Sequence, residues 1–154
     1  MKNPPSHKAT DGRRVMVFGT FDGLHEGHLD FFEQAREHGD YLIAVAGRDE
    51  NIKKIKGHFP KKRERERFTE LQKCNLVNKP VLGYDDDPYR VIETLKPDVI
   101  CLGYDQESFS KDLEKELKSR GLEIEVLRMK AFKPDKLHSS IIQKHVGYKQ
   151  NKRR

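Results

Sequence analysis

The strongest constraint on the fold is that short apolar stretches alternate with segments of helical periodicity along most of the chain. Five stretches have the apolar and β-branched content of buried strands, namely residues 13–19, 41–46, 80–83, 98–102 and 122–127. Helices are predicted between or after them, over residues 26–38, 63–75, 88–95, 108–120 and 139–146. Strands that are apolar along their whole length are typical of a parallel sheet with helices on both faces. We therefore predict a single α/β domain built on a doubly wound, five-stranded parallel sheet.

A sheet of this kind also predicts where a ligand binds. In doubly wound sheets, ligands occupy the crevice beyond the carboxyl ends of the strands, where the strand order reverses. We therefore expect the ligand-binding residues in the loops that follow residues 19, 102 and 127.

The composition excludes several other classes of protein. The chain has 154 residues, of which 36% are charged, against roughly 25% in a typical soluble domain. Its longest apolar run, residues 41–46, is far shorter than the roughly 20 residues of a membrane-spanning helix. The first 14 residues have no apolar stretch, and Cys74 and Cys101 are too few for a disulfide framework. We expect a reduced, cytoplasmic protein without membrane contact.

The formal net charge of +6 is concentrated at the end of the chain. Residues 143–154 hold five basic residues and no acid, whereas residues 13–142 are balanced. A basic tail binds polyanions without specificity, so the charge is poor evidence for a nucleic-acid-binding domain. We expect flexible tails over residues 1–12 and 147–154, around a domain that spans residues 13–146. A noncatalytic nucleotide-binding or nucleic-acid-associated module is the alternative that the tail keeps open.

One internal segment is strongly basic. Residues 51–67 contain eight Lys or Arg and only two Glu. Such an excess is satisfied either by solvent along a helix face or by an anionic ligand. Asp85, Asp86 and Asp87 form an opposite patch, which we interpret as loop and helix-capping residues.

The loop after the first predicted strand has the features of a polyphosphate site. Gly19 and Gly23 allow tight backbone turns, and Gly27 leaves the first helical turn open to an anion. His25 and His28 are three residues apart at the helix N-terminus, which brings both rings near one point. Two imidazoles there donate hydrogen bonds to phosphate oxygens and stabilise charge during in-line displacement. Two other interpretations are a helix-capping or internally packed histidine and a zinc pair, although the pair lacks a convincing third ligand, so no metal site is predicted.

The ten residues of this loop, GTFDGLHEGH at 19–28, resemble the GTFDxxHxGH signature of the cytidylyltransferase-like nucleotidyltransferases. The resemblance covers roughly residues 13–142. It implies a Rossmann-like α/β domain and a nucleotidyl transfer with Mg²⁺. In that reaction a substrate phosphate attacks the α-phosphate of a nucleoside triphosphate and pyrophosphate leaves. Members of the family are often dimeric, so a homodimer is one expected state.

Later segments resemble one branch of that family, the archaeal-type FAD synthases. They are AGRD at 46–49, IKKIKG at 52–57, LGY at 82–84 and KPDVICLGYDQ at 96–106. Glycerol-3-phosphate cytidylyltransferases tend to have an MGDDW-like sequence where this chain has GYDQ. The resemblance therefore implies that FMN and ATP are converted to FAD and pyrophosphate, with FMN and FAD as substrate and product and no tightly bound organic cofactor. The alternative is a cytidylyltransferase that uses CTP and glycerol 3-phosphate or another phosphoalcohol.

The resemblance also implies roles for individual residues. The catalytic set is His25, His28 and Lys56. The nucleotide-binding set is Gly19, Thr20, Phe21, His25, His28, Gly103, Tyr104, Asp105, Ser139 and Ser140. The set that contacts substrate phosphate is Lys53, Lys56, Arg67 and Arg128.

This chain departs from the family at the start of its last predicted helix. Relatives carry a basic residue after a pair of hydroxyl residues there, whereas this chain has Ile141 and Ile142 after Ser139 and Ser140. Arg128 and Lys144 are the candidates to compensate. No aromatic pair marks a flavin pocket; single aromatics such as Phe59, Tyr104 and Phe132 line one or belong to the core.

Overall fold

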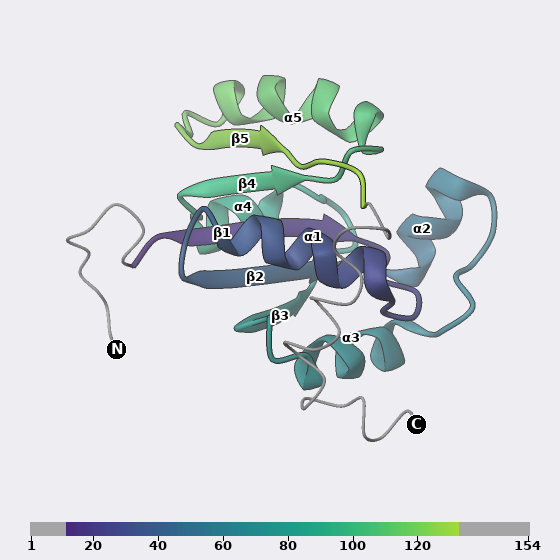
Figure 1. Ribbon diagram of the computed structural model, residues 1–154. Coiled ribbons are helices and arrows are strands. Elements are labelled where there is room, and N and C mark those ends of the chain that lie inside the picture. The colour runs from purple at the N-terminus through teal and green to yellow at the C-terminus, as the bar shows by residue number, and fades with distance from the viewer. Residues whose placement is uncertain (1–11, 133–154) are drawn as a thin grey trace.

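The computed structural model describes residues 12–132, apart from the side chains of residues 107–110 (Figure 1). Its centre is one five-stranded, all-parallel sheet with the strand order β3-β2-β1-β4-β5. The strands are β1 (Arg14–Gly19), β2 (Tyr41–Ala46), β3 (Lys79–Leu82), β4 (Val99–Leu102) and β5 (Glu125–Arg128). The predicted α/β class and the five-stranded parallel sheet are confirmed.

Helices cover both faces of this sheet, as its strands require. They are α1 (Glu26–Arg36), α2 (Asp49–Lys56), α3 (Glu64–Lys73), α4 (Arg90–Leu95) and α5 (Glu107–Ser119). The α1 side chain Phe32 and the α3 side chain Leu71 pack in one core layer with alternate strand residues such as Val17. The α4 side chain Ile92 and the α5 side chain Leu113 pack in a second layer on the opposite face. Burial on both faces explains why the central strands are apolar throughout.

Helix α2 was not among the predicted elements. It carries only Ile52 and Ile55 as apolar residues, and the rest of its sequence is acidic, amide or lysine. Its acidic residues stand in the first turn and its lysines in the last, an arrangement that the helix dipole favours. The helix ends at Gly57, whose φ of 86° is the left-handed conformation that glycine adopts at helix ends.

Two further predictions concern residues outside the range 12–132. The helix expected over residues 139–146 lies there, and so does the proposed C-terminal limit of the domain at residue 146. Among residues 12–132, each helix is too short or too polar to cross a lipid bilayer.

The strand register brings the loop starts to a common level. Gly19 at the end of β1 is paired with Ala46 at the end of β2, which in turn is paired with Leu82 of β3. The amide of Gly47 donates to the Gly19 carbonyl at 3.1 Å, and the amide of Gly83 donates to the Ala46 carbonyl at 2.9 Å. The three loops therefore leave the sheet side by side, and they form the floor of a cavity.

Candidate active site

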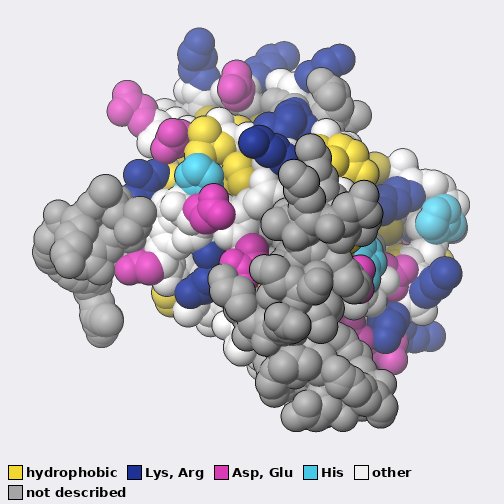
Figure 2. Space-filling model, in the orientation of Figure 1, with side chains coloured by type: hydrophobic (Ala, Val, Ile, Leu, Met, Phe, Trp, Pro, Cys, Tyr) yellow, Lys and Arg dark blue, Asp and Glu magenta, His cyan; other side chains and the backbone are white. Residues whose placement is uncertain are grey.

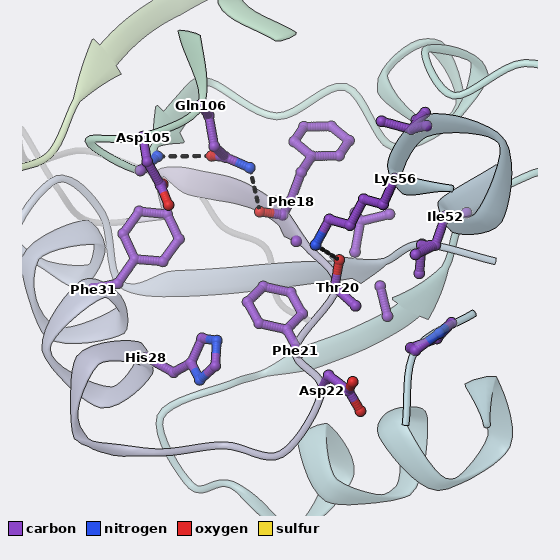
Figure 3. Close-up of a pocket in the computed structure, with 18 of the residues that line it drawn as sticks. Phe18, Thr20, Phe21, Asp22, His28, Phe31, Ile52, Lys56, Asp105 and Gln106 are labelled. Atoms are coloured by element: carbon purple, nitrogen blue, oxygen red, sulfur yellow. Dashed lines mark hydrogen bonds between the residues drawn. The ribbon is translucent and has the colours of Figure 1, made fainter. Parts of the chain in front are cut away.

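A cavity of about 760 Å³ lies beyond the carboxyl ends of the strands. It is lined by the loops after β1, β2, β3 and β4, by α1 and α2, and by Lys130 and Phe132 after β5. Figure 3 shows Lys56 and Ile52 of α2 on one side and Asp105 and Phe31 on the other, with Thr20 and Phe21 between them. The cavity therefore lies at the carboxyl ends of the strands, where the sequence predicted that a ligand would bind.

Both signature histidines stand at the N-terminus of α1. His25 is the N-cap residue, and its Nδ1 accepts a hydrogen bond from the Gly27 amide at 3.1 Å. The Nδ1 of His28 accepts from the His25 amide at 3.2 Å. The two ring centroids are 3.9 Å apart. Because each Nδ1 accepts a backbone N–H, the proton of each neutral ring belongs on Nε2, which is left to donate to a ligand.

Burial, and then the nearby His25, lower the pKa of His28 from 6.5 to about 4. At neutral pH His28 is therefore a neutral ring that donates through Nε2. Gly27 leaves room for the neighbouring His25 ring, because a Cβ at position 27 would lie 3.0 Å from Cε1 of His25 and would have to displace that ring. The helix-cap interpretation of His25 is correct, and the ligand interpretation stays a prediction that the cap allows, since the cap uses one ring nitrogen and leaves the other.

The Phe21 ring packs against His28 and helps to hold its position. The Phe21 ring is buried and meets the His28 ring edge-on at a centroid distance of 5.5 Å. The backbone of Phe21 has a φ of 52°, which a non-glycine residue adopts at a cost of order 1 kcal/mol. The ring also lies over Gly19, where a Cβ would stand 2.8 Å from it. Glycine at position 19 is thus a packing requirement for this loop.

Asp22 ties this loop to the segment before α3. Its carboxylate accepts hydrogen bonds from the amides of Lys61 at 2.7 Å and Lys62 at 2.8 Å. Burial acts to raise the pKa of Asp22, but these two amides and the charge of Arg67 outweigh it and hold the pKa below the ordinary value. Asp22 is therefore an ionised carboxylate that organises the backbone.

Arg67 is placed differently from the prediction that it contacts substrate phosphate. Its side chain is fully buried, and it does not line the cavity. The guanidinium donates to the Thr20 carbonyl at 2.8 Å, to the Lys62 carbonyl at 3.0 Å and to Asp49 Oδ1 at 2.6 Å. We correct its role to that of a positioning residue, because it bonds three protein groups and its burial keeps it from the cavity.

The basic segment separates into structural and available residues. Lys56 lines the cavity and donates from Nζ to the Thr20 hydroxyl at 3.1 Å. Lys53 lies outside the cavity lining, with Nζ 5.1 Å from the centre of the Phe59 ring. Lys62 forms an ion pair with Glu70 at 2.7 Å. In Figure 2, Lys and Arg side chains lie on the side of the molecule that holds α2 and α3 and also along the top, over α5.

The loop after β4 forms the opposite wall. Gly103, Tyr104 and Asp105 line the cavity, as predicted. Gln106, which was not in the predicted set, bridges this loop and β1: its Oε1 accepts from the Gly103 amide at 2.7 Å, and its Nε2 donates to the Phe18 carbonyl at 3.0 Å. Its place in the GYDQ segment was the sequence signal for it. Arg128 donates to the Gly103 carbonyl at 3.0 Å, so it supports the same loop from β5 and does not line the cavity.

A second glutamine holds the segment after β5. Gln34 of α1 accepts a hydrogen bond from the Lys130 amide at Oε1 and donates to the Lys130 carbonyl from Nε2, both at 2.9 Å. Nε2 also donates to Asp30 Oδ2 at 2.9 Å. Burial raises the pKa of Asp30. Nothing in the sequence marked these two residues, because helical spacing alone does not reveal a partner 96 residues away.

The other predicted site residues are Ser139 and Ser140, which lie outside residues 12–132. Within that range, no three His, Cys, Asp or Glu side chains are grouped so that they would hold a metal ion.

The parallel sheet, the cavity at the strand ends and the paired histidines at the start of α1 define a Rossmann-like nucleotidyltransferase. The model of the Cytidylyltransferase-like family matches residues 16–145. The chain belongs to this family, on the branch of the FAD synthases, as the comparisons with individual proteins show.

Relatives in archaea carry that similarity over most of the chain. An FAD synthase of Aciduliprofundum boonei is 40% identical over 119 residues, which cover 77% of this chain and 79% of the relative. An FAD synthase of Korarchaeum cryptofilum is 42% identical over 136 residues, 86% of this chain and 91% of the relative. Among solved structures, the lipopolysaccharide core biosynthesis protein from Thermoplasma volcanium is 30% identical with a TM-score of 0.74, over 79% of this chain and 98% of that protein. The resemblance seen in the sequence is confirmed.

Proposed function

We propose that this chain transfers the AMP moiety of ATP to FMN and releases pyrophosphate. An FMN phosphate oxygen attacks the α-phosphorus of ATP, a new P–O bond forms, and the bond from the α-phosphorus to the bridging oxygen breaks. The leaving pyrophosphate takes the electron pair. The observation that carries this proposal is the pair of histidines whose Nε2 donors are left for a ligand at the start of α1, in a chain of the FAD synthase branch.

His25 and His28 act on the charge that develops during this displacement. Preorganised donors lower the barrier most when they are aimed at a position where negative charge grows. A neutral His28 donates without first taking up a proton, and the dipole of α1 adds positive potential at its N-terminus. Neither ring serves as a nucleophile, because the FMN phosphate attacks directly.

Lys56 is the third member of the proposed catalytic set. Its Nζ stands at the Thr20 hydroxyl, on the opposite side of the cavity from Asp105 (Figure 3). A lysine there offsets the mutual repulsion of the FMN phosphate and the triphosphate. Mg²⁺ enters with ATP as part of the substrate, since phosphate oxygens are its preferred ligands. Lys53, exposed on the same helix, adds positive potential at longer range that attracts the anionic substrates.

The nucleotide base and ribose are assigned to the half of the cavity over β4 and β5. Gly103, Tyr104 and Asp105 present backbone groups and a carboxylate there. The loop of Gly19, Thr20 and Phe21 contacts the nucleotide at the centre. Ser139 and Ser140 remain proposed ligands of the terminal phosphates.

The proposal also includes a cellular location and an oligomeric state. A cytoplasmic location agrees with Cys74 and Cys101, which are both buried and not joined in a disulfide. A homodimer is proposed from the family resemblance, and sedimentation velocity of the purified chain tests it.

The test is an assay of the purified full chain with four substrate pairs: ATP or CTP, each with FMN or glycerol 3-phosphate, in the presence of Mg²⁺. FAD and an equal amount of pyrophosphate are expected from ATP and FMN. Conversion of glycerol 3-phosphate with CTP while FMN stays unchanged would contradict the flavin assignment and leave the nucleotidyltransferase class intact. A chain that binds ATP but converts none of the four pairs would support the noncatalytic alternative.

A further inference from the structure

An exposed isoleucine lies on the cavity wall formed by α2. The Ile55 side chain has a relative exposure of 82%, on a helix whose other apolar residue, Ile52, is only 6% exposed. A single exposed aliphatic side chain is common on protein surfaces. Ile55, however, lines the same cavity as Ile52, and Pro60 extends this apolar wall. These three residues form what we call the α2 ledge.

The α2 ledge belongs to the half of the cavity over β2 and β3. The facing residues there are Gly83 and Tyr84, which follow β3. The Asn51 side chain donates from Nδ2 to the Tyr84 carbonyl at 3.2 Å and so joins α2 to that loop. This half is separated from Asp105 and Phe31 by the β1 loop (Figure 3).

The ledge adjoins a cation that suits a phosphate. Lys56 follows Ile55 directly in the sequence, and its Nζ is held toward the β1 loop by the Thr20 hydroxyl. Ile52, Ile55 and Lys56 line the same cavity, so a ligand with its phosphate near Lys56 has room to extend over the two isoleucines. The ligand chemistry that matches this order is an anionic phosphate joined to a broad, largely apolar ring system.

We propose that the isoalloxazine ring of FMN binds on the α2 ledge, with Ile52 and Ile55 against its apolar face. This inference rests on the proposed function and adds the location of the flavin, which the aromatic residues of the sequence did not mark. It makes Ile55 a specificity-determining residue that favours a flavin phosphate over a small phosphoalcohol. Covering an aliphatic side chain with a ring gains free energy in proportion to the apolar area removed from water.

The test compares Ile55→Ser with two matched variants. Ile55→Leu keeps the apolar contact. Lys54→Ser also replaces a long, exposed side chain of α2 by serine, but at a position outside the cavity lining. Ile55→Ser is expected to raise the KM for FMN roughly tenfold. The KM for ATP and the kcat should stay within twofold of wild type, and both control variants should behave like wild type.

A second measurement does not depend on turnover. Flavin fluorescence on titration of FMN into each full-length variant, with His28→Ala as an added background, reports ring binding directly. A weaker FMN affinity in Ile55→Ser than in Lys54→Ser supports the inference.

Three outcomes overturn it. One is a wild-type chain that makes FAD while Ile55→Ser has an unchanged KM for FMN. Another is a rise in the KM for ATP alone in Ile55→Ser, which would place the adenine base of ATP on the α2 ledge. The last is a dimer in the wild type that becomes a monomer in Ile55→Ser, which would make the ledge an interface between copies. A wild-type chain that makes no FAD contradicts the proposed function itself, and the fluorescence titration then still decides whether Ile55 contacts the ring.

Discussion

The two halves of the cavity are built in different ways. Over β4 and β5, side chains reach across to backbone groups: Gln106 and Arg128 hold the loop after β4, and Gln34 holds Lys130 after β5. Over β2 and β3, the start of α2 is held through Asp49, which exchanges hydrogen bonds with Glu64, whereas the residues at its end are exposed.

This difference matches two kinds of recognition. A base and a ribose are distinguished by fixed hydrogen-bonding groups, and a loop held at its backbone keeps such groups in place. A phosphate needs charge more than direction, and lysine side chains on a free helix end adapt to it. The histidines stand where the two halves meet, so the reacting phosphates are expected there. The following predictions test this division, from the largest effect to the smallest.

Replacement of the histidine at the junction should have the largest effect. His28→Ala removes an Nε2 donor that is held in place by the His25 amide. We expect kcat to fall by about 100-fold, a loss of about 3 kcal/mol of transition-state stabilisation, because this is the usual cost of removing one preorganised donor. Steady-state kinetics with ATP and FMN measure it. A variant that retains more than a third of wild-type kcat would show that the junction lies elsewhere.

Arg67 joins the β1 loop to the start of α2, and its loss should act on stability. Arg67→Met leaves the Thr20 carbonyl without its guanidinium donor and Asp49 without its ion pair. Because the guanidinium is buried but Asp49 is partly exposed, we expect the free energy of unfolding to fall by about 3 kcal/mol. Urea denaturation measures this loss. Arg65→Met, at an exposed position on the same helix, is the control and should change stability by less than about 0.5 kcal/mol.

The low pKa of His28 predicts a dependence of stability on pH. Between pH 6.5 and about 4 the unfolded chain binds a proton at His28 that the folded chain does not. The free energy of unfolding therefore falls as the pH is lowered through this window, by about 2 kcal/mol between pH 7 and pH 5 from this residue.

Urea denaturation at both pH values compares wild type with His28→Asn, which has no titrating group at that position. The variant should lose less stability on acidification. Equal losses in the two proteins would mean that His28 titrates normally and is not held neutral by its surroundings.

Gln106 separates the two halves most directly. Gln106→Ala removes the partners of the Gly103 amide and the Phe18 carbonyl. We expect the KM for ATP to rise about tenfold, which corresponds to about 1.4 kcal/mol, while the KM for FMN stays unchanged. Gln106→Glu retains the acceptor for Gly103 and should fall between alanine and wild type. A rise in the KM for FMN of the same size would show that the halves do not act separately.

The sequence predicted the sheet well because buried parallel strands leave a local signature. Residues 41–46 were predicted as a strand and form β2 with the same bounds. Helix α2 was missed for the corresponding reason, since a helix with two apolar residues has almost no buried face to detect. Its acidic start, its lysines and Gly57 were the signals that remained.

For the site, the histidine loop and the GYDQ loop could be located because each combines glycines with a reactive or polar side chain in a short stretch. The structure brings Gly19, Thr20, Phe21, His25 and His28 to one cavity with Lys56 and the loop of residues 103–105. The sequence could not predict which basic side chains face the cavity and which are buried in the protein. Lys56 and Arg67 lie in the same basic segment, yet one lines the cavity and the other is buried.

The sequence by itself determined the five strands, the helices between them other than α2, the position of the polyphosphate loop and the family, because each depends on residues close together along the chain. The tertiary structure alone decided which basic residues reach the cavity, and that Gln34 and Gln106 hold its far wall. Those outcomes depend on partners up to 96 residues apart, and hydrogen bonds over such separations exist only once the sheet has brought the loops together.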